Sequence, residues 1–349
     1  MSRFIAVLTL LLGCAPAPIT LGPPAVPDHA LGVGVRTFTL VDTTRSTAAN
    51  GSQPARPERN LPTRVWYPSL ANLSADEVRN AAPDPGPWPL IVFVHGSSGT
   101  PGVYSWFGRA MARAGYVVVA ADMPSTSLNA PGGPSDLHVE DQPADVAFLA
   151  DRALEGDLLP AGIIDDRPGY AVAGHSTGGT VALLAAYAPG ADPRVAAILP
   201  FSGDACFFAD ALFRSRAVPL LAISGTADLY VPPLINGERT YELALAPKTL
   251  VVLTGGTHLG FTDLAIPDDP STVPDQPGDP LPTTLAAFGD ASACNPIPPR
   301  SSDAPMALAE QHRLTAAWSA AFLDALIRHA PDAFDALRRE AVSATVRSE

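Results

Sequence analysis

The chain has 349 residues, of which 47% are apolar and 16% charged, a composition typical of a packed globular protein rather than a disordered one. Its formal net charge of −13 excludes the basic surface that a nucleic-acid partner requires. Lys248 is the only lysine, so a basic cluster that recruits the chain to a membrane is not expected either.

The N-terminal segment is typical of an export signal. Arg3 precedes an apolar run, Phe4 to Leu12, that is too short to cross a bilayer, which takes about 20 residues. The run ends in Leu-Leu-Gly-Cys, which resembles the lipobox of bacterial lipoproteins; an ordinary signal peptide that contains a cysteine is the alternative. We expect a signal peptide over residues 1–13, a lipidated Cys14, and a Pro/Ala-rich tether over 14–33. The protein would then be exported and held on a bacterial membrane, periplasmic or cell-surface face, by this lipid alone.

Residues 34–340 are predicted to form one domain, which opens with two strands and no helix between them. This suggests an antiparallel entry into the sheet. Short apolar runs then alternate with helical segments, and this alternation predicts an α/β fold with a mostly parallel central sheet and helices on both faces. The expected strands are 35–41, 64–67, 90–94, 116–121, 170–173, 196–199, 220–223 and 249–253, and the expected helices are 106–114, 144–154, 180–187 and 306–327, with a short extension after Pro331.

A Pro- and Asp-rich insertion at 262–305 interrupts this alternation. A segment of that length without periodicity is often a lid or a binding loop, and the alternative is a surface excursion fixed by a disulfide. If Cys14 carries lipid, Cys206 and Cys294 remain as the pair that can form this disulfide in an oxidising compartment. Two unrelated buried thiols are the other possibility.

Gly174-His175-Ser176-Thr177-Gly178 matches the pattern G-x-S-x-G between an apolar strand and an apolar helix. A sharp strand-to-helix turn of this kind exposes the serine oxygen above the sheet edge, which predicts Ser176 as a nucleophile. His95-Gly96-Ser97 directly follows the strand 90–94. Its tight turn and the start of the helix after Ser176 can present backbone N–H groups to an oxyanion, and we expect these donors to be Ser97 and Thr177.

A serine hydroxyl needs a base, and the base needs an orienting carboxylate. His258 follows the last core strand on a glycine-rich loop and fits the chain order of serine, acid and histidine. Two aspartates at strand ends compete for the role of the acid. Asp228 lies in the segment Gly-Thr-Ala-Asp-Leu-Tyr-Val-Pro and is preferred, whereas Asp204 lies one strand earlier.

The motifs HGSSG, GHSTGG, GTADLYVP and GGTH, in this order, resemble the α/β-hydrolase superfamily over residues 35–330. Within it, the segment Arg64 to Pro68 is similar to a dienelactone-hydrolase-related group that contains platelet-activating-factor acetylhydrolases, chlorophyllases and cutinase-type polyester hydrolases. The resemblance implies a Ser-Asp-His esterase without metal or organic cofactor. Dienelactone hydrolases proper use cysteine, and polyester hydrolases commonly carry methionine where this chain has Thr177. Acetylhydrolases place their acid one strand earlier, at the position of Asp204.

The sequence therefore predicts a serine hydrolase that cleaves carboxylic esters, small or lipid-like, through an acyl-enzyme. Acyl transfer to an alcohol by the same residues is an alternative within enzymes. The alternative from another class is a non-catalytic surface lipoprotein that retained the fold. The intact set Ser176, Asp228 and His258 favours catalysis.

Overall fold

The computed structural model describes residues 28–268, 285–290, 294, 299, 301–339 and 343–349. The predicted signal peptide, Cys14 and most of the predicted tether lie outside this range. Much of the predicted 262–305 insertion lies outside it as well.

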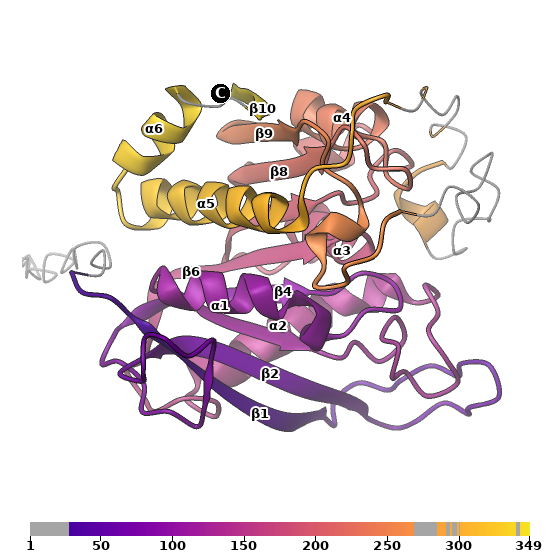
Figure 1. Ribbon diagram of the computed structural model, residues 1–349. Helices are drawn as coiled ribbons and strands as arrows, with labels where there is room; N and C mark the ends of the chain where they lie inside the picture. Colours follow the sequence, from indigo (N-terminus) through magenta and orange to yellow (C-terminus); the bar gives the residue numbers. More distant parts are fainter. Residues whose placement is uncertain (1–27, 269–284, 291–293, 295–298, 300, 340–342) are drawn as a thin grey trace, which may run out of the picture.

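A ten-stranded sheet forms the centre of the described molecule, in the order β10-β9-β8-β7-β6-β4-β5-β2-β1-β3 (Figure 1). The strands from β4 to β9 run parallel, whereas β2 pairs antiparallel with both β1 and β5, as predicted for the entry into the sheet. The strands are β1 Gly32–Asp42, β2 Arg59–Ser69, β3 Val78–Arg79, β4 Trp88–Val94, β5 Val117–Ala121, β6 Ile164–His175, β7 Val195–Phe201, β8 Leu220–Gly225, β9 Lys248–Leu253 and β10 Ala344–Ser348.

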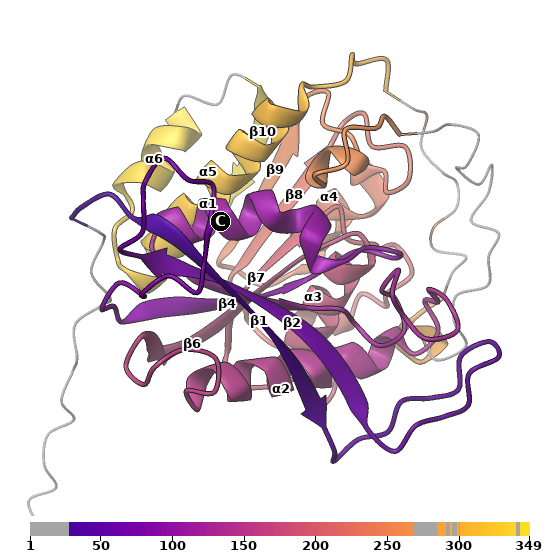
Figure 2. The same ribbon diagram turned by 60° about the horizontal axis from the view of Figure 1, so that its bottom comes forward.

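Helices cover both faces of the sheet (Figure 2). Parallel strands buried on both sides need apolar residues at every position, and β4, β5, β8 and β9 are buried throughout. Alternate residues of β4 point to opposite faces: Val92 packs with α2 and α3, and Phe93 with α1 and α5. The helices are α1 Ser105–Arg113, α2 Gln142–Leu154, α3 Thr177–Tyr187, α4 Gly237–Leu243, α5 Leu308–Ile327 and α6 Asp332–Arg339. The predicted α/β fold with helices on both faces is confirmed.

Three elements differ from the sequence-based expectation: the two-residue strand β3, the helix α4 and the strand β10. The helix α4 was not predicted because its seven residues are mostly polar and lack an apolar period. The strand β10 lies beyond residue 340, where the domain was expected to end, and pairs antiparallel with β9 at the sheet edge. Edge strands need only one buried face, so this short polar segment carries a weak signal.

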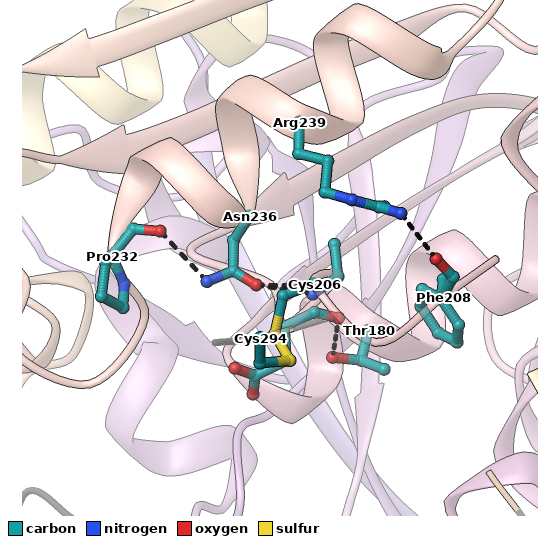
Figure 3. Close-up of a disulfide and its surroundings, with 9 residues drawn as sticks. Thr180, Cys206, Phe208, Pro232, Asn236, Arg239 and Cys294 are labelled. Carbon is teal, nitrogen blue, oxygen red and sulfur yellow. Dashed lines mark hydrogen bonds between the residues drawn. A yellow bond between two sulfur atoms is a disulfide. The ribbon is translucent and has the colours of Figure 1, made fainter. Parts of the chain in front are cut away.

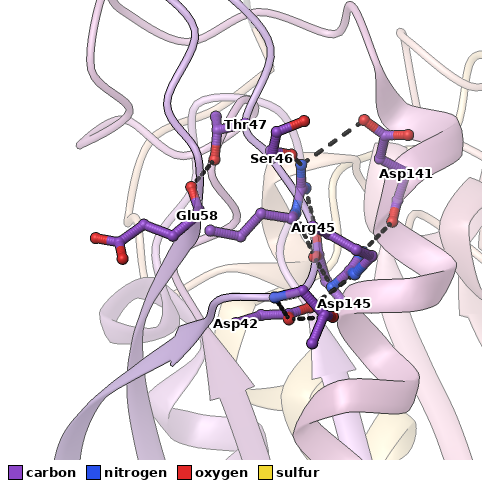
Figure 4. A network of polar contacts seen from close by, with 9 residues as sticks. Asp42, Arg45, Ser46, Thr47, Glu58, Asp141 and Asp145 are labelled. Carbon is purple, nitrogen blue, oxygen red and sulfur yellow. Dashed lines mark hydrogen bonds and ion pairs between the residues drawn. The ribbon is translucent and has the colours of Figure 1, made fainter.

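A buried ionic network fastens the β1–β2 hairpin to α2 (Figure 4). The Arg59 guanidinium donates to both oxygens of Asp145, at 2.6 and 2.5 Å, and Arg45 joins Asp42 to the same Asp145 carboxylate. The Asp145 and Arg59 side chains are almost fully buried. Because removing either partner would leave an uncompensated buried charge, this network holds the hairpin in one position against the parallel strands. In the described part of the chain, no helix has the length and apolar character needed to span a membrane.

Candidate active site

The predicted site residues meet at one edge of the sheet, where the parallel strands end. Ser97 follows β4, Ser176 follows β6, Asp228 follows β8 and His258 follows β9. Loops at the carboxyl ends of parallel strands are where open α/β sheets build their sites.

Ser176 occupies the turn between β6 and α3. Its backbone has φ 54° and ψ −125°, a strained conformation for a residue with a side chain. The Ser176 N–H donates to the carbonyl of Phe201 at 2.9 Å, and its own carbonyl accepts the N–H of Thr180 at 3.1 Å. These bonds hold the strained turn between strand and helix, with the Ser176 side chain only half-buried. This is the geometry expected from the G-x-S-x-G pattern.

Glycines allow the strand ends to approach the turn. A Cβ at Gly178 would lie 2.1 Å from the carbonyl oxygen of Val94, so no larger residue fits there. A Cβ at Gly96 would lie 3.1 Å from the Cβ of Ser176. The turn after β4 therefore lies directly against Ser176, and it carries Ser97 into the site.

The backbone N–H groups of Ser97 and Thr177 are available beside Ser176. Thr177 is the first residue of α3, where N–H groups have no partner within the helix. Within the described residues, neither N–H has a hydrogen-bond acceptor. Two unpaired donors next to a serine, one of them at the positive end of a helix, suit the stabilisation of an oxyanion.

Two buried aromatic side chains fix the turn that contains Ser97. His95 Nε2 accepts the N–H of Met123 at 3.0 Å, so its Nδ1–H donates to the carbonyl of Gly96 at 2.8 Å. The Tyr104 hydroxyl accepts the N–H of Gly96 at 3.0 Å and donates to His175 Nδ1 at 3.0 Å. Burial lowers the pKa of His95, which keeps the imidazole neutral. His95 therefore supports the loop and is not the base.

His258 and Asp228 form a buried pair. His258 Nδ1 lies 2.9 Å from Asp228 Oδ2, and the two residues are 7% and 5% exposed. The second oxygen of Asp228 accepts the N–H groups of Tyr230 and Val231 at 2.9 and 2.8 Å, which fixes the carboxylate. Burial opposes the charged imidazolium, but the Asp228 carboxylate raises the pKa of His258 above its ordinary value, with help from Asp204. With Nδ1–H bound to Asp228, Nε2 is left as the proton acceptor.

The imidazole of His258 lies next to the Ser176 turn. Its ring centroid is 4.5 Å from that of His175, the residue before Ser176, and 5.1 Å from that of Tyr230. Burial, together with the charge of His258, holds the pKa of His175 well below its usual range. His175 therefore stays neutral and packs beside His258.

The competing aspartate lies close by without bonding the imidazole. Asp204 has no hydrogen bond to His258 in the described part of the chain, and its electrostatic influence on the imidazole is weaker than that of Asp228. Burial, reinforced by the negative charges of Asp228 and Asp136, raises the pKa of Asp204 to about 7, although the charge of His258 opposes this. Of the two candidates, Asp228 is the one in contact with the imidazole.

The predicted disulfide between Cys206 and Cys294 is present and joins the loop after β7 to the predicted insertion (Figure 3). Asn236 holds the same loop from the other side. Its side-chain oxygen accepts the N–H groups of Ala205 and Cys206 at 2.9 and 3.0 Å, while its amide donates to the carbonyl of Pro232 at 3.0 Å. These bonds connect the end of the Asp228 loop to the loop that begins at Asp204.

Three polar residues of the site were not predicted: Asp136, Asn236 and Asp268. The Thr177 hydroxyl donates to the Asp136 carboxylate at 3.5 Å. Burial raises the pKa of Asp136, and the hydroxyls of Ser97 and Thr177 oppose this rise. Asp268 accepts N–H groups from the loops of Asp228 and His258. Asp136 and Asn236 bind residues that are 30 or more positions away in the sequence, and Asp268 lies in a loop without periodicity. No local sequence pattern therefore identifies these three residues. Across the described residues, no group of three or more His, Cys, Asp and Glu is placed to hold a metal ion.

Comparisons with known proteins agree with this fold. Residues 75–200 match the family model described as Chlorophyllase. A search of curated proteins finds no significant match. Among solved structures, a ferulic acid esterase from Streptomyces cinnamoneus is similar, with 23% sequence identity and a TM-score of 0.59, over 88% of this chain and 94% of that chain. The family-model match confirms the resemblance to the group that contains chlorophyllases, and the solved structure shares the fold of this chain.

Proposed function

We propose that this protein hydrolyses carboxylic esters through an acyl-enzyme, with Ser176 as nucleophile, His258 as base and Asp228 as the orienting acid. The observation that carries the proposal is the His258–Asp228 pair, buried beside the strained turn of Ser176. The match to the Chlorophyllase family model and the likeness to a ferulic acid esterase support ester chemistry.

The chemistry follows from the orientation of the imidazole. His258 Nε2 takes the proton of the Ser176 hydroxyl while the oxygen attacks the ester carbonyl, and Asp228 stabilises the imidazolium that forms. The N–H groups of Ser97 and Thr177 bind the oxyanion of the tetrahedral intermediate. The imidazolium then gives its proton to the departing alcohol, and a water molecule, activated by the same imidazole, releases the acid. None of these steps uses a metal or an organic cofactor.

The substrate is a neutral ester, small or lipid-like, bound at the edge of the sheet. Carboxylates lie around the base: Asp204 and Asp268 add to the effect of Asp228 on the imidazole. An additional negative charge on the acyl group would be repelled there, so neutral acyl groups are favoured.

We also propose that the chain is exported and anchored by lipid on Cys14. The support is the sequence Leu11-Leu12-Gly13-Cys14 and the Pro/Ala-rich segment that follows it. A lipid at the N-terminus would keep the enzyme at a membrane without any further contact with the bilayer.

A panel of chromogenic esters that differ only in acyl length, assayed with the wild type and with Ser176→Ala, tests the proposal. We expect hydrolysis of several neutral esters by the wild type and a loss of about 10⁶ in kcat for the variant, because the residues of such a site act as a unit. Folding of the variant is checked by its Tm. Equal activity of the two proteins would contradict the proposal.

A further inference from the structure

The predicted insertion begins with a buried carboxylate. Residues 263–267 are exposed, but the next residue, Asp268, is only 8% exposed. A carboxylate leaves water only where other groups replace its hydration, and the groups here are backbone amides from two loops. Asp268 Oδ2 accepts the N–H of His258 at 2.8 Å and that of Leu229 at 3.3 Å, and Oδ1 accepts the N–H of Leu259 at 2.8 Å.

These amides belong to the two loops that carry the acid and the base. The Leu229 amide directly follows Asp228, and the His258 amide belongs to the base itself. Before these residues, the loops are joined by the Ala227 N–H, which donates to the carbonyl of Gly256 at 2.9 Å. Asp268 makes the corresponding connection after Asp228. The two loops are therefore joined on both sides of the His258–Asp228 pair. A backbone hydrogen bond joins them on one side, and the Asp268 side chain joins them on the other.

We infer that Asp268 is a positioning residue of the active site. By binding the amides of Leu229, His258 and Leu259 at once, it sets the distance and orientation of the imidazole relative to Asp228. The inference rests on the proposed function, because it assigns to Asp268 the placement of that base. It also gives the start of the 262–305 insertion a role in catalysis that does not depend on its acting as a lid.

The charge of Asp268 also acts on the imidazole. The ionisable groups that face His258 are the carboxyl groups of Asp228, Asp204 and Asp268, the phenol of Tyr230, and the imidazole of His175, which is neutral. Burial lowers the pKa of His258 and the three carboxylates raise it. Removing the charge at position 268 therefore lowers the pKa of His258, and the acid limb of kcat/KM moves to lower pH.

The test compares Asp268→Asn with Asp268→Glu and with Asp303→Asn. Asparagine has one acceptor oxygen, so its NH₂ group opposes at least one of the amides that Asp268 binds. Asp303 is a matched control, because it also bonds a strand-end residue, the Thr226 hydroxyl, but contacts none of the three loop amides that Asp268 binds. We expect Asp268→Asn to lower kcat about 10- to 100-fold, as the loss of a supporting hydrogen bond does elsewhere, with little change in KM. The acid limb should move to lower pH, and Asp303→Asn should match the wild type.

Asp268→Glu keeps the charge but displaces it by one methylene. We expect it to fold, to recover part of the lost kcat and to restore the acid limb. A wild-type kcat in Asp268→Asn would overturn the inference, and so would a decrease in kcat without movement of the acid limb, since that is the effect of a general loss of structure. If Asp268→Asn does not fold, Asp268→Glu decides: a several-fold decrease in kcat at wild-type KM supports the inference, and a wild-type kcat overturns it.

The same assay with Ser176→Ala separates this inference from the proposed function. Activity that survives in Ser176→Ala contradicts the proposed function, whatever the Asp268 variants do. If Ser176→Ala is inactive and both Asp268 variants match the wild type, the proposed function stands and only the inference fails.

Discussion

The pair His258–Asp228 permits a quantitative prediction for Asp228→Asn. In the wild type, one oxygen of Asp228 accepts the Nδ1–H of His258 and the other accepts the N–H groups of Tyr230 and Val231. An asparagine that keeps its oxygen on these two amides must turn its NH₂ group toward His258. The imidazole then carries its proton on Nε2, the atom that has to accept the proton of Ser176.

The decrease in kcat is set by the less costly of the two orientations that the side-chain amide at position 228 can adopt. The wrong tautomer costs about 10⁴ in turnover, or about 5.4 kcal/mol. If the amide flips instead, the imidazole keeps the correct tautomer but two buried N–H groups lose their acceptor, at about 1–3 kcal/mol each. The sum is about 2–6 kcal/mol, so we expect kcat of Asp228→Asn to decrease between about 30- and 10⁴-fold.

The assay is the kcat of a chromogenic short-chain ester at a pH where His258 is neutral, with Asp204→Asn as the matched control. Asp204 influences the imidazole only electrostatically, so its variant should change kcat far less. A decrease of less than about tenfold in Asp228→Asn would show that Asp228 does not set the tautomer of His258, because either arrangement costs more than this. A larger loss in Asp204→Asn than in Asp228→Asn would place the acid one strand earlier.

The pH dependence, the disulfide and the lipid anchor can each be tested separately. The imidazolium of His258 cannot accept a proton, so activity is lost as the pH falls below the pKa of His258. Because carboxylates raise this pKa, the acid limb of kcat/KM should lie above pH 6.5 and should move to lower pH in Asp204→Asn. A wild-type acid limb below pH 6.5 would contradict this. The disulfide closes a loop spanning 88 residues and stabilises the fold by at most about 4–5 kcal/mol. Replacing both Cys206 and Cys294 by serine should therefore lower Tm by several degrees. An unchanged Tm, or two free thiols in peptide mapping of the exported protein, would refute the bridge. Cys14→Ser should release the protein from the membrane fraction, and a variant that still sediments after a salt wash would contradict lipidation.

The sequence predicted the elements that bury apolar residues on both faces. The strands β4 to β9 are short apolar runs, and their alternation with helices was enough to predict the sheet. The elements it missed, β3, α4 and β10, are short and carry few apolar residues, and their position depends on neighbours that are distant in the sequence. Propensity and periodicity carry little information where tertiary contacts decide the structure.

For the site, local motifs identified the turn of Ser176 and the loops of Asp228 and His258. The choice between Asp228 and Asp204 depended on which carboxylate reaches the imidazole, and the structure shows that contact for Asp228. Asp268 could not be found in the same way. It is one acid among many in a Pro- and Asp-rich segment, and only the folded chain distinguishes it by burying it against the amides of two other loops.

Covalent labelling with a fluorophosphonate shows whether Ser176 is a nucleophile activated by His258. We expect one equivalent of adduct per chain, mapped to Ser176 by peptide mass analysis, and a strong decrease in the labelling rate for His258→Ala, because the serine hydroxyl is weakly nucleophilic without its base. An adduct on another serine, or labelling of Ser176 at the wild-type rate in His258→Ala, would contradict this.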